Sequence, residues 1–246
     1  MNPNVPLIVP IVNSSHFDII PQQQKLFGKK KGFIITNANC STTGLVSALK
    51  PIQDAFGPLS KIVVTTMQAI SGAGYPGVPS LDIMSNVVPY ISGEEPKMEE
   101  ETCKILGTVD STMTSIQHLQ ETKVSASCNR VPVIEGHTES VFLEFAQKPA
   151  PSVEEIKQVL LSYTCEAQKL ACPSAPKRAV VVCENRDRPQ PRLDSLLENG
   201  NAVVVGGIRK CNVFDVKFTL LVHNTILGAA GSSIMNAEIA AARGLL

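Results

Sequence analysis

The sequence lacks the features that mark proteins of membranes, nucleic acids or the secretory route. Twenty-two basic and 22 acidic residues leave no formal net charge, so the charge balance favours neither nucleic acid nor an anionic membrane as a partner. No apolar run approaches the roughly 18 residues that a membrane span needs. The opening stretch MNPNVPLIVPIVN has neither a basic leader nor a signal-peptide core. We therefore expect a cytoplasmic protein.

Paired cysteine motifs are also missing. The seven cysteines form an odd set without CxxC spacing, which in a cytoplasmic protein favours reduced thiols over a disulfide framework or a metal site. Most of them are expected to be small core residues. A reactive cysteine must therefore be identified from its local sequence.

The hydrophobic pattern predicts strands and helices in an α+β arrangement. Apolar segments at 6–12 and 32–36 resemble the buried strands of a parallel sheet. Further strands are predicted at 60–68, 123–129, 138–146, 178–183, 201–206 and 212–222. Helices are predicted from Ser41 onward, with Pro51 bending the first, and at 96–106, 153–163 and 228–246. Few helices separate the later strands, which indicates a mixed, largely antiparallel sheet flanked by parts of a parallel α/β unit.

The segment ITNANCSTTG places Cys40 where a predicted strand ends and a helix begins. Free backbone N–H groups and the positive end of the helix dipole favour a thiolate there, so we expect the pKa of Cys40 to fall below about 8.5. The same N–H groups could hold an oxyanion. Ser41, Thr42 and Thr43 are expected to cap the helix. A buried structural cysteine beside an ordinary helix cap is the alternative interpretation.

A second segment, CNRVPVIEGHTESVFLEF, carries Arg130 and His137 around a Pro/Gly-interrupted turn. A histidine at the mouth of a strand can exchange a proton near neutral pH. An arginine can hold a carboxylate through two parallel hydrogen bonds. Taken singly, each residue also fits a plain structural role, as a loop histidine or a salt-bridge partner. The long Gly/Pro-rich loop at 71–79 is predicted to be functional.

The blocks NANCSTTG, TTMQAISGAGYPG, ISGEEPKMEEETCKIL, CNRVPVIEGH, RPQPRLD and HNTILGAAGSSIMNAE resemble, in order, those of aspartate-semialdehyde dehydrogenases. The similarity covers nearly the whole chain and is greatest to the branch shared by fungi and archaea. Glyceraldehyde-3-phosphate dehydrogenase and N-acetyl-glutamyl-phosphate reductase also place a cysteine on a helix. They differ around the thiol and lack the RVPVxxGH block.

The resemblance implies a role for individual residues. Cys40 matches the nucleophile and His137 the acid/base. Five residues match the substrate pocket, with Arg130 on the α-carboxylate, Glu94 on the ammonium, Lys97 on the phosphate, Asn39 near the leaving phosphate and Gln68 orienting the substrate. Four others resemble positions that line the nicotinamide half of NADP: Asn13, Asn224, Gly228 and Asn236. The neighbouring Glu99, Glu100 and Glu101 are expected to form a solvated acidic helix face.

The implied reaction is the reductive dephosphorylation of β-aspartyl phosphate to aspartate semialdehyde, through a Cys40 thioester and hydride from NADPH. It belongs to the aspartate pathway to lysine, threonine and methionine. No metal is implied. The resemblance also implies a homo-oligomer, a dimer or a tetramer, with neither nucleic acid nor membrane as a partner.

The sequence departs from the family at its start, where no GxxGxxG-type phosphate loop is found. We therefore expect an NADP-binding remnant at 1–40, a catalytic and dimerisation domain at 41–222, and a C-terminal helix at 223–246 returning to the nucleotide domain. Because the shortened chain lacks this loop, we expect it to bind NADP weakly, and the sequence leaves its activity alone undecided. The alternatives are a truncated, non-catalytic paralogue that only dimerises, and a Cys/His hydrolase, which would need no nicotinamide.

Overall fold

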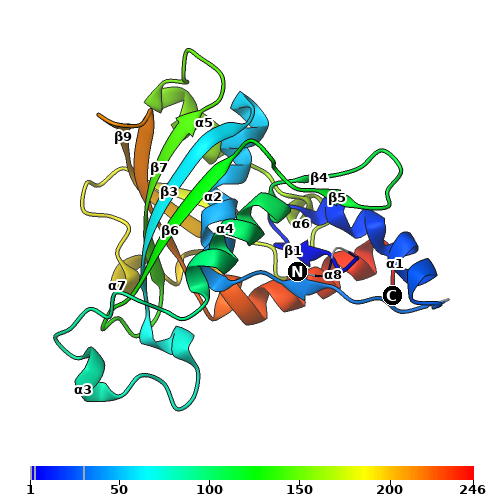
Figure 1. Ribbon diagram of the computed structural model, residues 1–246, viewed down its shortest axis with the longest axis horizontal. Helices are drawn as coiled ribbons and strands as arrows, with labels where there is room; N and C mark the ends of the chain where they lie inside the picture. Colours follow the sequence, from blue (N-terminus) through cyan, green and yellow to red (C-terminus); the bar gives the residue numbers. More distant parts are fainter. Residues whose placement is uncertain (1, 3, 30) are drawn as a thin grey trace.

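A computed structural model describes residues 2, 4–29 and 31–246. Within these residues the central element is a six-stranded sheet in the order β6-β3-β7-β10-β9-β8 (Figure 1). The strands are β3 (Leu59–Gln68), β6 (Lys123–Arg130), β7 (His137–Phe145), β8 (Val180–Cys183), β9 (Val203–Lys210) and β10 (Val216–Val222). The three inner pairings are antiparallel, whereas β3–β6 and β8–β9 are parallel. The predicted mixed, largely antiparallel sheet is thus confirmed.

One face of this sheet packs against three helices, α2 (Cys40–Phe56), α4 (Glu94–Ile105) and α5 (Val153–Ser162). Every second residue of β7 is buried, because alternate side chains of a strand point to opposite faces. Helix α2 continues through Pro51 and is buried along most of its length. Helix α5 starts with the capping box that Ser152 and Glu155 predict. In the described part of the chain, no helix is both long and apolar enough to span a bilayer.

Helix α4 lies along β6, and its acidic side chains bond to that strand. Glu95 Oε1 accepts from the amide of Cys128 and Glu99 Oε1 from the amide of Ala126, each at 3.0 Å. Glu101 is buried and accepts from the amide of Asn39 at 2.8 Å. The prediction that residues 99 to 101 form a solvated face is therefore wrong for Glu99 and Glu101. Unpaired strand amides attract carboxylates that sequence alone places in solvent.

The segments at the two ends of the chain form a smaller lobe. Strands β1 (Leu7–Ile8) and β2 (Thr36–Asn37) pair in parallel, and α8 (Gly231–Ala242) lies close to them (Figure 1). Both strands are shorter than predicted from 6–12 and 32–36. Strand β1 is short because Asn13 binds its backbone. The Asn13 side chain accepts from the amide of Val9 and donates to the carbonyl of Leu7, which turns the chain back.

The remaining elements are short and connect the larger ones. The helices are η1 (Ser14–Ile19), α1 (Ile20–Leu26), η2 (Ile70–Ala73), α3 (Ser80–Ile83), α6 (Glu166–Lys169), α7 (Pro191–Asp194), η3 (Leu197–Gly200) and η4 (Ile226–Ala230), and the strands are β4 (Thr108–Val109) and β5 (Ile116–Gln117). The C-terminal helix predicted at 228–246 is therefore divided into η4 and α8.

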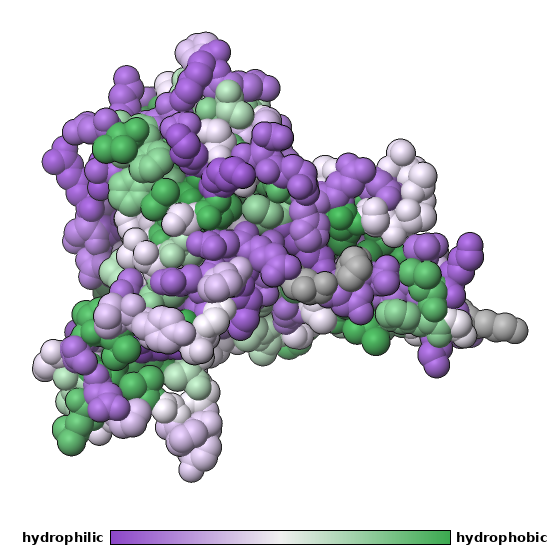
Figure 2. Space-filling view, viewed as in Figure 1, coloured by the Kyte–Doolittle hydropathy of each residue, from purple (hydrophilic) through white to green (hydrophobic). Residues whose placement is uncertain are grey.

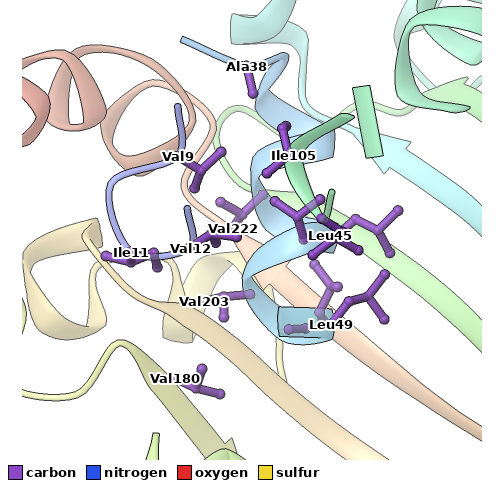
Figure 3. Packing of buried hydrophobic residues seen from close by; sticks show 14 of the residues in the cluster. Val9, Ile11, Val12, Ala38, Leu45, Leu49, Ile105, Val180, Val203 and Val222 are labelled. Carbon is purple, nitrogen blue, oxygen red and sulfur yellow. The ribbon is translucent and has the colours of Figure 1, made fainter. Parts of the chain in front are cut away.

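A hydrophobic core joins the sheet to the smaller lobe. Figure 3 shows Leu45 and Leu49 of α2 beside Val203 and Val222 of the sheet, with Val9, Ile11 and Val12 on the lobe side. All of these residues belong to one buried cluster. Because α2 is anchored on both sides, its first residue, Cys40, is held where the sheet and the lobe meet.

Candidate active site

The candidate nucleophile is the first residue of α2. Asn39 caps this helix, and its Oδ1 accepts from the amides of Ser41 and Thr42 at 3.0 and 3.1 Å. The expectation that Ser41, Thr42 and Thr43 cap the helix is therefore wrong. Thr43 is already inside the helix, where its hydroxyl donates to the carbonyl of Asn39. An asparagine in the last non-helical position satisfies the free amides directly.

Cys40 faces the histidine that the second segment supplies. His137 begins β7, is fully buried, and its Nε2 lies 3.1 Å from Cys40 Sγ. Its Nδ1 accepts from the amide of Ala69 at 3.0 Å. A neutral imidazole has one donor and one acceptor nitrogen, so Nε2 carries the proton and points it at the sulfur. The structure thus brings together two residues that are 97 positions apart.

Burial governs the ionisation of this pair. It raises the pKa of Cys40 to about 12, and the nearby charge of Glu94 adds to this effect. Burial also lowers the pKa of His137 to about 3, with Arg130 contributing in the same direction. The prediction that the pKa of Cys40 falls below that of a free cysteine is therefore wrong. Loss of water around the sulfur outweighs the helix start, a balance that only the folded environment reveals. Both groups are neutral at pH 7.

The polar residues of the predicted substrate pocket surround this dyad. Arg130 ends β6, is buried, and its Nη1 donates to the carbonyl of Ala69 at 2.7 Å. Gln68 ends β3 directly beside Arg130 in the parallel pairing. The carboxylate of Glu94 accepts from Gln68 Nε2 at 3.2 Å and from Asn39 Nδ2 at 2.8 Å, and Lys97 Nζ lies 3.5 Å away. The structure therefore brings all seven predicted catalytic and substrate-binding residues into one connected group.

The sequence analysis did not identify three further contributors. Glu101 fixes the backbone of Asn39, and Ala69 bonds to both His137 and Arg130 through its main chain. At Gly72, an added Cβ would lie 2.9 Å from Arg130 Nη1 and 3.0 Å from His137 Cε1. The Gly/Pro-rich composition at 71–79 was the available signal for Gly72. No sequence signal identifies a backbone contact such as that of Ala69.

The four predicted cofactor residues divide into two kinds. Gly228 lies against the nucleophile, since a Cβ there would be 2.8 Å from Cys40 Cβ. Asn236 donates to Ile8 and Asn37, and among the described residues its Oδ1 has no partner. By contrast, the side chain of Asn224 is bonded to Gly136 and Ser71.

The side-chain amide of Asn13, like that of Asn224, is hydrogen-bonded within the protein. It is buried, and both of its amide atoms are bonded within the turn after β1. The side-chain amides of Asn13 and Asn224 therefore stabilise loops of the chain through hydrogen bonds to other residues of the protein.

Comparison with known proteins places this geometry in a class of enzymes. The family model described as semialdehyde dehydrogenase, dimerisation domain, matches residues 49–227. The aspartate-semialdehyde dehydrogenase of Cryptococcus neoformans is 58% identical over 247 residues, which cover 100% of this chain and 68% of that protein. The protein of the same name from Methanothermobacter thermautotrophicus is 45% identical, covering 97% and 67%.

A solved structure agrees with these relatives. The aspartate semialdehyde dehydrogenase of Candida albicans, crystallised with NADP, matches with a TM-score of 0.91 and 51% identity, over 100% of this chain and 69% of that one. The chain thus spans about two thirds of the length of these relatives. It belongs to the aspartate-semialdehyde dehydrogenase family.

Proposed function

We propose that this chain converts β-aspartyl phosphate to aspartate semialdehyde, with Cys40 as the nucleophile, in the aspartate pathway to lysine, threonine and methionine. The observation that carries the proposal is the 3.1 Å contact between Cys40 Sγ and His137 Nε2 at the start of a capped helix. The sulfur attacks the acyl carbon and the bond from that carbon to the phosphate oxygen breaks. The thiol proton leaves with the departing phosphate, and a thioester remains on Cys40.

The thiolate needs local positive charge, because burial opposes its formation. Three groups supply it. The amide of Ser41 at the helix start lowers the pKa of Cys40, the guanidinium of Arg130 attracts the sulfur, and His137 presents Nε2–H to it. As negative charge moves to the acyl oxygen, Nε2–H shares its proton with that oxygen. This is the acid/base role that we assign to His137.

The substrate carries a carboxylate, an ammonium and a phosphate, and the pocket supplies a partner for each. We assign the α-carboxylate to Arg130, whose planar guanidinium can form two parallel hydrogen bonds. The ammonium is assigned to Glu94 and the phosphate to Lys97 and Asn39, which both lie within hydrogen-bond or ion-pair reach of Glu94. Gln68, bonded to Glu94, then orients the acyl group.

NADP fits the residues on the Gly228 side of the nucleophile. The glycine leaves no side chain against Cys40, and Asn236 Oδ1 in the smaller lobe has no hydrogen-bond partner among the described residues and could act as an acceptor. When bound, the cofactor supplies the hydride that reduces the thioester. We further propose that 1–40 and 223–246 belong to a nucleotide-binding part, and 41–222 to the catalytic and dimerisation domain. In support, Asn236 joins α8 to both β1 and β2.

Activity of the 246-residue chain can be measured in the reverse direction. With aspartate semialdehyde and NADP, we expect NADPH to form only when inorganic phosphate is also present, because the thioester must be released by phosphate. Omission of phosphate is the control. A folded chain that forms no NADPH with all three components would contradict the proposal and would favour the alternative of a paralogue that only dimerises.

An arm formed by residues 70–92 is proposed as the contact between two copies of the chain. It extends from the active-site loop and carries α3, and Figure 2 shows apolar surface gathered on this part of the molecule. Its exposed large apolar side chains are Tyr75, Leu81, Met84, Val87 and Tyr90. A monomer rarely exposes so many together, which supports a homodimer, with a tetramer as two such dimers.

The arm gives a direct prediction for oligomeric state. Leu81 is 91% exposed, and Leu81→Asp would place a charge in the apolar contact. We expect the dimer dissociation constant to rise by about tenfold or more, measured by analytical ultracentrifugation. The matched control is Met113→Asp on the β4–β5 turn, also an exposed apolar residue. Equal dissociation constants for Leu81→Asp and the unaltered chain would count against the arm as the interface.

A further inference from the structure

A carboxyl group that the reaction scheme does not use lies behind the dyad. Glu139 follows His137 by two positions on β7, so both side chains point to the same face of the sheet. Glu139 is fully buried, and within the described residues neither of its carboxylate oxygens has a hydrogen-bond partner. Burial raises the pKa of Glu139 well above its ordinary value, which favours the protonated form of this carboxyl.

The carboxyl group of Glu139 lies against α2, the helix that begins at the candidate nucleophile. Glu139 lies under Gly44 of α2, where an added Cβ would be 3.2 Å from Oε1 and 2.7 Å from Val222 Cγ1. Gly44 follows Cys40 by four residues and therefore lies on the same face of the helix, one turn further along. The absence of a side chain at Gly44 makes room for the carboxyl close to the first turn of α2. The charge of Glu139 raises the pKa of Cys40 and of Cys128.

Packing alone does not explain an acid at this position. Its cross-strand neighbours are Thr66 on β3 and Leu220 on β10, both fully buried, and neither is hydrogen-bonded to its carboxyl group. A leucine or methionine would fill such a site without leaving polar atoms unpaired, whereas a buried unpaired carboxyl opposes folding.

We propose that Glu139 is a positioning residue: while its carboxyl group keeps a proton, Cys40 can become a thiolate. The buried space between α2 and β7 then holds one negative charge and not two. The inference rests on the proposed role of Cys40 as the nucleophile. While Glu139 keeps its proton, the Cys40 thiol can release its own. When Glu139 releases its proton to solvent at higher pH, the carboxylate opposes a second charge one helical turn away, and Cys40 keeps its proton.

Other titratable groups lie around Cys40 and Glu139 and are unchanged by a substitution at Glu139. They are Cys128 and Arg130 on β6, Glu94, Glu95 and Glu101 on α4, His137 on β7 and His223 after β10. The flanking residues of β3 and β10, Thr66 and Leu220, do not titrate. A change made at Glu139 alone therefore isolates its charge.

The test is the pH dependence of Cys40 alkylation by iodoacetamide, followed by mass spectrometry of the peptide that carries Cys40. In Glu139→Gln, we expect the midpoint of the rate profile to fall by about one pH unit, because the competing carboxylate is gone. Glu144→Gln, on the same strand but bonded to Lys61 at the surface, is the matched control and should keep the original midpoint. An unchanged midpoint in folded Glu139→Gln would overturn the inference.

Two features keep this test decisive. Alkylation needs no turnover, so a chain that fails the NADP assay still reports on Glu139, and an unaltered Cys40 that resists alkylation at every pH counts against the nucleophile itself. If Glu139→Gln does not fold, Glu139→Leu removes the same ionisable group and gives the same comparison. A merely structural role for Glu139 would alter stability but would leave the midpoint where it was.

Discussion

Cys40→Ala is expected to reduce kcat by about five orders of magnitude, because the thioester of the proposed reaction forms on the Cys40 sulfur. The substitution removes one sulfur atom from a half-buried position at the start of α2. Asn39 still caps the helix, so we expect the melting temperature to change by no more than about 2 °C. The measurement is the initial rate of phosphate-dependent NADPH formation, together with a thermal unfolding curve.

A matched variant separates the loss of the nucleophile from the loss of any thiol. Cys103 on α4 is also a half-buried free cysteine, and Cys103→Ala should keep normal turnover. If folded Cys40→Ala turned over at the rate of the unaltered chain, the assignment of Cys40 would be wrong. A loss of turnover in both variants would indicate a general sensitivity of the fold instead.

Arg130→Lys is expected to raise the KM for aspartate semialdehyde by about 100-fold, which corresponds to the loss of one strong hydrogen bond between charged groups. Arg130 is buried at the end of β6, and its Nη1 is held by the carbonyl of Ala69. Lysine keeps the positive charge but has a single ammonium, which cannot reproduce the planar fork. The measurement is a steady-state kinetic series at saturating NADP and phosphate.

The control for this variant is Arg178→Lys, which changes an exposed arginine paired with Glu198. Its KM should equal that of the unaltered chain. An unchanged KM in Arg130→Lys would show that the α-carboxylate is bound elsewhere. A fall in kcat with an unchanged KM would assign Arg130 to thiolate stabilisation alone.

Much of the fold could be predicted because its signals are local. The alternating pattern of β7, the apolar run of β3 and the Ser152–Glu155 capping box each depend on residues that are close in sequence. The strand at 6–12 was predicted too long because the amide of Asn13 captures the backbone of Leu7 and Val9. Hydrophobicity does not report a side chain that competes for strand hydrogen bonds.

The candidate site was predictable in its residues but not in its energetics. Cys40, Arg130 and His137 stand out through their local sequence, and the structure groups them. The pKa of Cys40 was predicted in the wrong direction, because the helix start is visible in the sequence and the desolvation is not. Glu139 was missed for a related reason. Its burial results from the strand register and from Gly44 on a separate helix, which the sequence does not place together.

The main chain of Ala69 has a consequence for how this site tolerates mutation. Its N–H donates to His137 Nδ1 and its carbonyl accepts from Arg130 Nη1, so the proposed acid/base residue and the proposed substrate clamp are both fixed by one amino acid without use of its side chain. Proline would delete the donor, and any larger side chain at this fully buried position would displace its neighbours and disturb both bonds. A small residue at position 69 is therefore needed to keep His137 and Arg130 in register with each other.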